Sequence, residues 1–195
     1  MLPDAAFEPA AGQSISATSA SDIWVVGTTF DLATGKTLAE ALHFDGTAWT
    51  VVPMAQPNPN TPTIGAVTAI SPTDAWAVGE QIGATPAAGG STLIEHWDGT
   101  SWNIVPSPTP GGDPGLTGVA ARSATDVYAV GGELPSVNGG PSQALILRWN
   151  GTSWTDDTGG TISGSPGAAA TFPGAAREWA VGTSSENQGL VLSHS

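Results

Sequence analysis

The sequence predicts an all-β fold: a β-propeller with four four-stranded blades of about 52 residues, whose last blade lacks its outer strand. Three observations support this prediction. A string of the type Asp-x-Trp-Ala-Val-Gly occurs four times at intervals of 51 or 52 residues. A second string, of the type Asp-Gly-Thr-x-Trp, follows it in three copies. No window has helical periodicity, and the 26 glycines and 16 prolines disfavour helices.

The first string is interpreted as the second strand of each blade. It reads DIWVVG, DAWAVG, DVYAVG and REWAVG, so its aromatic residue recurs as Trp24, Trp76, Tyr128 and Trp179. Large rings that recur at the blade period suit the wedge-shaped space between neighbouring sheets. We therefore expect these four residues to be structural.

The second string is interpreted as a hairpin between the third and fourth strands. Asp98-Gly99 and its counterparts are the residue pairs that tight hairpins favour, because both residue types tolerate positive φ. The Trp that follows recurs as Trp49, Trp102 and Trp154, and we expect it to pack between blades as well.

The repeat divides one domain, 1–195, into blades at approximately 13–53, 64–106, 116–157 and 167–195. The fourth blade ends before its fourth strand. This pattern is compatible with a four-bladed ring with an incomplete last blade, with half of an eight-bladed ring made by two chains, and with a segment of a longer array. We favour the last two because an open edge strand invites pairing with another chain.

The two strings, DxWAVG and HWDGTxWxxVP, resemble the kelch-like and WD-like propeller repeats of secreted and surface bacterial proteins. The resemblance extends from about Gln13 to His194. It implies blade architecture but selects no function, because propellers serve as lectins, scaffolds and enzymes.

The recurrent acids Asp22, Asp74 and Asp126 precede the second strand. We expect them to be structural, each accepting hydrogen bonds from backbone N–H groups two residues further on.

The three histidines, His43, His96 and His194, are assigned to one repeat position, which Arg148 fills in the third copy. Equivalent positions of different blades lie on a ring around the propeller axis, and this position accepts a permanent cation. We therefore expect neither a metal site nor another cofactor. No nucleophile elbow, P-loop or dinucleotide motif is present, and Cys is absent, so we expect no catalytic residues.

A ligand platform is expected, if one exists, at Trp97, Trp149 and Phe44, which directly precede the hairpin and are expected to be less buried. The loops between second and third strands vary in length while the strands stay alike, which is typical of a binding face. These loops are Thr28–Thr37, Gln81–Gly90, Leu134–Gln143 and Ser184–Gln188.

Seventeen acidic and four basic residues give a net charge of −13, which repels phosphate backbones and excludes nucleic-acid binding. Apolar runs are too short for membrane insertion. The Lys-poor, Cys-free composition indicates a secreted or cell-surface bacterial protein, whose export signal we expect outside these 195 residues.

Together these features predict a non-catalytic extracellular interaction or structural module that binds a protein partner or assembles with itself through its open edge strand. The alternative is a lectin-like carbohydrate-binding module. A glycan-acting enzyme is the third hypothesis.

Overall fold

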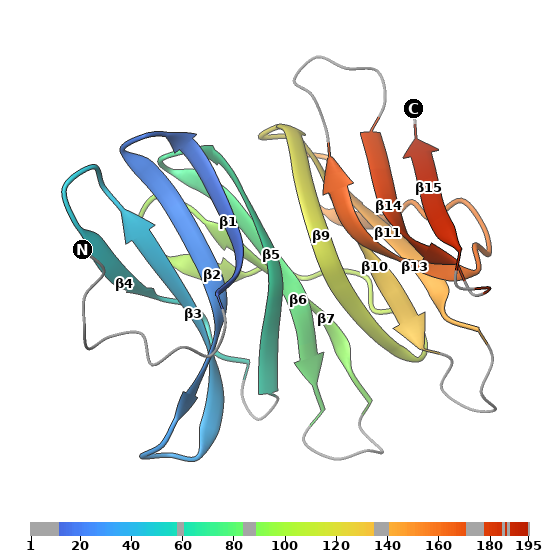
Figure 1. Ribbon diagram of the computed structural model, residues 1–195, viewed down its shortest axis with the longest axis horizontal. Helices are drawn as coiled ribbons and strands as arrows, with labels where there is room; N and C mark the ends of the chain where they lie inside the picture. The colour runs from blue at the N-terminus through green and yellow to red at the C-terminus, as the bar shows by residue number, and fades with distance from the viewer. Residues whose placement is uncertain are drawn as a thin grey trace.

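The computed structural model describes residues 12–57, 61–83, 89–134, 141–170, 178–184, 186 and 188–194. In this part of the chain four antiparallel sheets stand side by side in a row (Figure 1). The first sheet contains β1 (Gly12–Ser19), β2 (Asp22–Asp31), β3 (Lys36–Phe44) and β4 (Trp49–Pro53). The second contains β5 (Thr61–Ser71), β6 (Asp74–Ile82), β7 (Ser91–Trp97) and β8 (Trp102–Ile104). The third contains β9 (Asp113–Ser123), β10 (Asp126–Leu134), β11 (Gln143–Trp149) and β12 (Trp154–Asp156).

The fourth sheet has three strands in the described part: β13 (Gly164–Ala170), β14 (Glu178–Ser184) and β15 (Gly189–His194). The prediction of an all-β, propeller-like fold whose last blade lacks its outer strand is confirmed. Strands β5, β9 and β13 each begin three residues before the expected blade limits at 64, 116 and 167.

The first strands of successive sheets lie next to one another: β1 beside β5, β5 beside β9, and β9 beside β13. Small residues allow this approach. A Cβ on Gly65 would lie 2.9 Å from the carbonyl oxygen of Leu116, and one on Gly118 would lie 2.9 Å from the Cα of Ala168. Neighbouring sheets are therefore closest at their first strands, and the space between them widens toward the outer strands.

The glycine of the Val-Gly pair in β6, β10 and β14 is required by a β-bulge. At Gly79, Gly131 and Gly182 a Cβ would overlap a carbonyl oxygen of the neighbouring first strand. The register of that strand shifts at or next to each of these positions. This close approach explains why glycine recurs there, since no other residue fits.

The Asp-Gly hairpins have loops of four residues, with strand pairing resuming at Trp97 and Trp102 in the second sheet. The Oδ1 atom of Asp98 accepts hydrogen bonds from the N–H groups of Thr100 at 2.8 Å and Ser101 at 2.9 Å. Together with the Thr100 hydroxyl these bonds lower the pKa of Asp98 to about 2. The hairpin therefore delivers the following Trp at a fixed position.

Three aromatic rings meet at each of the first two interfaces between sheets. Trp24 of the first sheet is fully buried against Trp97 and Trp102 of the second, with ring centroids 5.0 and 5.2 Å away. Between the second and third sheets, Trp76 meets Trp149 at 4.9 Å and Trp154 at 5.3 Å. We call these groups the three-ring clusters. In each sheet, the rear face is the one directed toward the following sheet and the front face is the one directed toward the preceding sheet. Each cluster contains one ring from the rear face of one sheet and two rings from the front face of the next.

Glu95 is fully buried at the interface of the first and second sheets. Its Oε2 atom accepts a hydrogen bond of 2.9 Å from the Ala55 N–H. Its Oε1 atom has no hydrogen-bond partner in the described part of the structure. Burial raises the pKa of Glu95 to about 7, although the Ala55 hydrogen bond lowers it. Leu42 and Leu147 occupy the same register position in the first and third sheets.

Replacement of Glu95 by Leu should remove a pH-dependent loss of stability. The folded chain retains a proton on Glu95 that the unfolded chain has lost, so the stabilisation is complete below pH 4.5 and disappears as the pH rises through about 7. Relative to Glu95→Leu, the wild type should lose about 3 kcal/mol of unfolding free energy between pH 4 and pH 8. Urea unfolding across this range measures the difference.

Glu95→Gln is the matched control, because its amide retains an acceptor for Ala55 and does not titrate. Its unfolding free energy should follow that of Glu95→Leu in pH dependence. Parallel profiles for the wild type and both variants would show that Glu95 is ionised in the folded protein.

Candidate functional site

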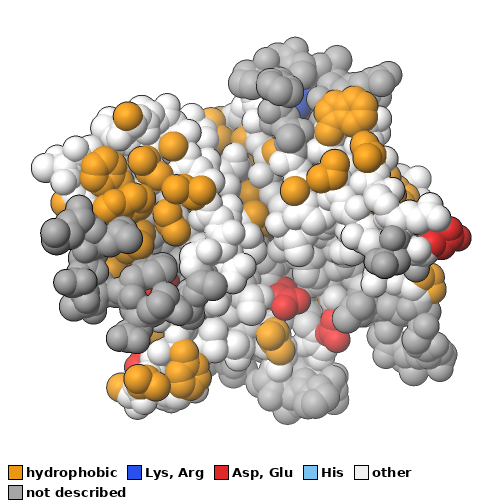
Figure 2. Space-filling model, viewed as in Figure 1, with side chains coloured by type: hydrophobic (Ala, Val, Ile, Leu, Met, Phe, Trp, Pro, Cys, Tyr) orange, Lys and Arg blue, Asp and Glu red, His pale blue; other side chains and the backbone are white. Residues whose placement is uncertain are grey.

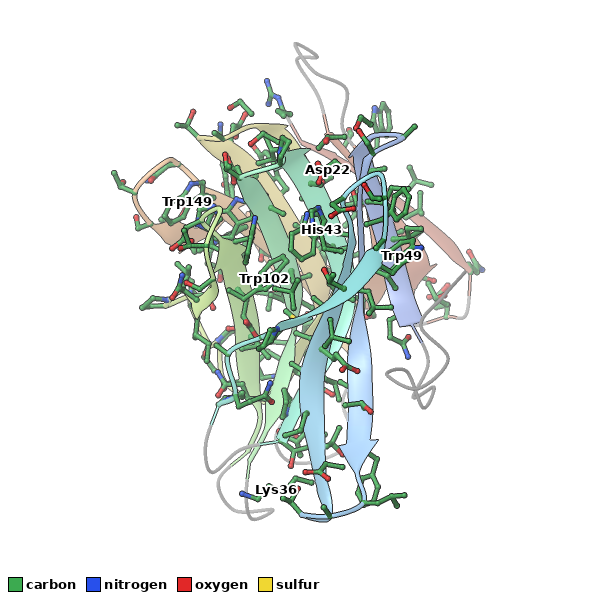
Figure 3. The ribbon with its side chains drawn as sticks, turned by 90° about the vertical axis from the view of Figure 1, so that its left-hand side faces the viewer. Asp22, Lys36, His43, Trp49, Trp102 and Trp149 are labelled. Carbon is green, nitrogen blue, oxygen red and sulfur yellow. The ribbon has the colours of Figure 1, made fainter. Side chains whose placement is uncertain are left out.

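A carboxylate, an imidazole or guanidinium group and an aromatic ring form a repeated contact at one end of the sheets. In the first sheet, His43 Nε2 lies 2.6 Å from Asp22 Oδ1, and the His43 ring stacks on Trp24 with centroids 4.3 Å apart. The Thr18 hydroxyl also donates to Asp22. Figure 3 shows Asp22 and His43 next to each other, at the opposite end of the sheet from Lys36. The contact recurs with Asp74, His96 and Trp76, and with Asp126, Arg148 and Tyr128.

These contacts correct the expected partner of the recurrent acids. Asp22, Asp74 and Asp126 hold a cationic or imidazole side chain of the third strand, not backbone N–H groups two residues further on. The alternation of side chains explains why: each acid lies two residues before the aromatic residue that pairs with this side chain, so all three groups lie on the same face of the sheet. In each of these three sheets the acid contacts the group that lies against the ring of the second strand.

The position assigned to His194 was wrong by one residue. Trp24 pairs with His43 across the sheet, but Trp179 pairs with Ser193, and His194 pairs with Glu178. The segment LVLSH thus aligns with LILRW of the third sheet, which puts His194 in the position of Trp149. The side chain of His194 lies outside the described residues. Among those described, no group of three or more His, Cys, Asp or Glu side chains is arranged to hold a metal.

The proposed platform residues do not share one surface. Trp97 and Trp149 lie within the three-ring clusters, and their indole N–H groups donate to the carbonyl oxygens of Pro72 at 3.1 Å and Ala124 at 3.2 Å. Packing between sheets accounts for both residues without a ligand. Phe44 lies instead on the outward face of the first sheet, against Trp49 at 5.3 Å.

The front face of the first sheet has no described sheet packed on it. It carries the Phe44–Trp49 ring pair, which corresponds to the buried pairs Trp97–Trp102 and Trp149–Trp154. Ile15 is 66% exposed and Val51 is 38% exposed on the same face. Hydrophobic side chains gather over this sheet at the left of Figure 2. The sheet thus presents two rings of a cluster without the third.

The rear face of the fourth sheet is the complementary end of the row. Trp179, which was expected to pack between sheets as Trp24 and Trp76 do, is 45% exposed because no described sheet covers it. Val181 and Val191, which pair directly across the sheet, are 49% and 63% exposed. This face therefore presents the single ring of a cluster without the other two.

The loops expected to form a binding face are only partly described. Strands β2 and β3 extend to Asp31 and Lys36, so the first loop is reduced to a turn closed by the Gly35 N–H to Asp31 carbonyl bond. Residues 84–88, 135–140, 185 and 187 of the other three loops lie outside the described residues. Figure 1 shows the lower ends of β2, β3, β6 and β7 pointing the same way.

Beside the third of these loops, a polar cavity of about 510 Å³ is lined by Glu133, Gln143 and Asp156 together with neighbouring backbone. Glu133 Oε2 and Gln143 Oε1 are buried and have no hydrogen-bond partner in the described part of the chain.

No family model matches the sequence, and no curated protein matches it. Among solved structures, the chain is similar to an endosialidase of phage phi92, with a TM-score of 0.58 and 13% identity over 88% of this chain and 30% of that one. It also matches Ycf48 bound to D1 peptide, with a TM-score of 0.44 and 18% identity over 92% of this chain and 51% of that one. The chain thus spans about a third and about half of the lengths of these two proteins, and its likeness to the endosialidase shows the β-propeller fold alone. No described helix is long and apolar enough to cross a membrane.

Replacement of Asp22 by Ala should lower the free energy of unfolding by about 2 kcal/mol, because it leaves the half-buried His43 imidazole without its hydrogen-bond partner. Urea unfolding measures the change. His43→Arg is the control, since the third sheet makes the same contact with Arg148 at 2.9 Å from Asp126. His43→Arg should lower the free energy of unfolding by well under half as much as Asp22→Ala does. Equal losses for the two variants would mean that ring stacking, not the acid, holds this position.

Proposed function

We propose that this chain is a non-catalytic extracellular propeller module that associates with further copies of itself, the rear face of the fourth sheet packing on the front face of the first sheet of the next copy. The carrying observation is the complementarity of the two end faces, on which Trp179 is 45% exposed and Phe44 and Trp49 are half-buried. One end presents Trp179, and the other presents the pair Phe44 and Trp49. Joined, they would rebuild the three-ring cluster that the chain already forms twice within itself.

The surrounding residues support the same arrangement. On the front face, Ile15 and Val25 occupy the positions that Val67 and Ala77 fill in the buried interface between the first and second sheets. On the rear face, Val181 corresponds to Val26, which is fully buried there. Apolar groups thus meet apolar groups across the proposed contact, whose strength comes from removing them from water.

One residue on the front face weakens the match. Glu40 occupies the position of Leu93 and Leu145, which are buried in the two internal interfaces. Burial raises its pKa, so a contact that buries it further favours its protonated form. Self-association should therefore weaken as the pH rises, and Glu40→Leu should strengthen it and remove much of this pH dependence.

Solution mass tests the proposal directly. The wild type should show a concentration-dependent mass above the 19.5 kDa of one chain in sedimentation or light scattering. Trp179→Asp and Trp49→Asp should each remain monomeric, because each lacks one of the two faces. An equimolar mixture of these two variants should form dimers and nothing larger, because only one complementary pair of faces remains.

Leu32→Asp is the matched control, since Leu32 is 86% exposed on the turn between β2 and β3, away from both faces. It should associate as the wild type does. A monomeric wild type at all concentrations, or a mixture that stays monomeric while both variants are folded, would refute head-to-tail association.

A lectin-like carbohydrate site is the second candidate, supported by the polar cavity at Glu133, Gln143 and Asp156. Sugar hydroxyls could supply the partners that the buried Glu133 and Gln143 oxygens lack. Calorimetric titration with neutral oligosaccharides should then show binding that Glu133→Gln weakens and Gln143→Ala abolishes. Sugar binding that survives both substitutions would place the site elsewhere.

A further inference from the structure

A polar pocket of about 300 Å³ lies at the first strands of the first three sheets. Strands β5 and β9, which line much of it, lie side by side in the middle of the row (Figure 1). The residues at the points where the registers of β1, β5 and β9 shift all line this pocket: Gln13, Gly65 and Thr117. A bulge turns its extra residue out of the regular alternation, so three neighbouring strands direct these positions to one place.

Glu80 is the charged side chain among the described residues that line this pocket. Its Oε1 atom accepts a hydrogen bond of 3.2 Å from the Thr63 hydroxyl. Its Oε2 atom lies close to Gly115, where a Cβ would be only 2.9 Å away. The position of Gly115 is filled by Thr63 in the second sheet and by Ser165 in the fourth. Glycine at this position therefore leaves room for the carboxylate and for the pocket beside it.

The Glu80 carboxylate forms no ion pair with a cation in the described part of the chain. Arg122 and Arg148 both contact Asp126, which begins β10 at the opposite end of the sheets. The chain has a net charge of −13, so its electrostatic field attracts cationic ligands. A ligand with a positive charge would thus supply what this pocket lacks.

The groups around Glu80 indicate what else such a ligand carries. The hydroxyl of Thr28 and the amide of Gln13 line the pocket, and both group types donate and accept hydrogen bonds, as sugar hydroxyls do. A volume of about 300 Å³ is at the lower end of the range for small-molecule sites, which suits one or two sugar rings. A ligand with one ammonium group and several hydroxyl groups therefore matches the lining better than an alkyl amine.

We infer that the pocket at Glu80 binds a protonated amino sugar, such as the glucosamine unit of a polysaccharide. Its ammonium group pairs with the Glu80 carboxylate, and its hydroxyl groups bond to Thr28, Thr63 and Gln13. This inference does not rest on the proposed function, because the pocket shares no lining residue with the cavity at Glu133 and includes none of the rings of the two end faces.

Calorimetric titration with the disaccharide of glucosamine, in mildly acidic buffer where its amines are protonated, tests the inference. The Trp49→Asp protein is used because its end-to-end contact is disabled, so association between chains adds no heat. The disaccharide should bind saturably. Its N-acetylated counterpart has the same rings without the ammonium groups, and should bind about tenfold more weakly or worse.

Three further substitutions in this protein localise the binding. Glu80→Gln keeps the shape of the side chain, removes its charge, and should weaken binding of the glucosamine disaccharide about tenfold or more. Gly115→Ser should weaken it as well, because the new side chain fills the space beside Oε2. Glu133→Gln is the matched control, since it removes the same charge from the other polar cavity, and should leave binding unchanged. Circular dichroism and urea unfolding verify that each variant is folded.

Several results would overturn the inference. These are no binding at millimolar concentration, equal binding of the N-acetylated disaccharide, and equal weakening by Glu80→Gln and Glu133→Gln, which would show attraction to the overall charge of the chain. Binding of N-acetyl-lysine amide as tight as that of the disaccharide would show that a peptide ammonium is the ligand instead. None of these results depends on the mass of the wild type, so a monomeric wild type would refute end-to-end association and leave this site intact.

Discussion

Packing of one sheet on the next through three aromatic rings is the interaction on which the rest of this structure depends. Neighbouring sheets approach closely at their first strands, where Gly65 and Gly118 leave no room for a side chain. They diverge toward their outer strands, and large rings fill the space that opens there. Burial of three aromatic rings at each of the first two interfaces stabilises the packing, because such rings remove much apolar surface from water.

Two other repeated features serve this packing. The Asp–His or Asp–Arg contact holds a flat group against the buried ring of the second strand, as His43 does on Trp24. The Asp-Gly hairpin places the outer-strand Trp of one sheet against the second-strand ring of the preceding sheet, as Trp102 packs on Trp24.

The features with functional potential are the places where this repeated packing is incomplete. The front face of the first sheet has a ring pair without a single ring, and the rear face of the fourth has Trp179 without a pair. Carboxyl groups lie at two positions that leucine fills in other sheets, Glu40 on the front face of the first sheet and Glu95 in an interface, and burial raises the pKa of both. Similarity to a propeller of 13% identity supports the fold but says nothing of these surfaces.

The sequence by itself determined the blade period, the strand order within each blade and the missing outer strand, because these follow from repeated turn residues and alternating side chains. Only the tertiary structure decided what each repeated residue contacts. Contacts between residues 22 positions apart, such as that of Asp74 with His96, have no local signature, and a one-residue error in aligning the last copy moved His194 to the wrong face of its strand. Exposure depends on which sheets are neighbours: Trp24 and Trp179 occupy the same repeat position, yet one is fully buried and the other is 45% exposed.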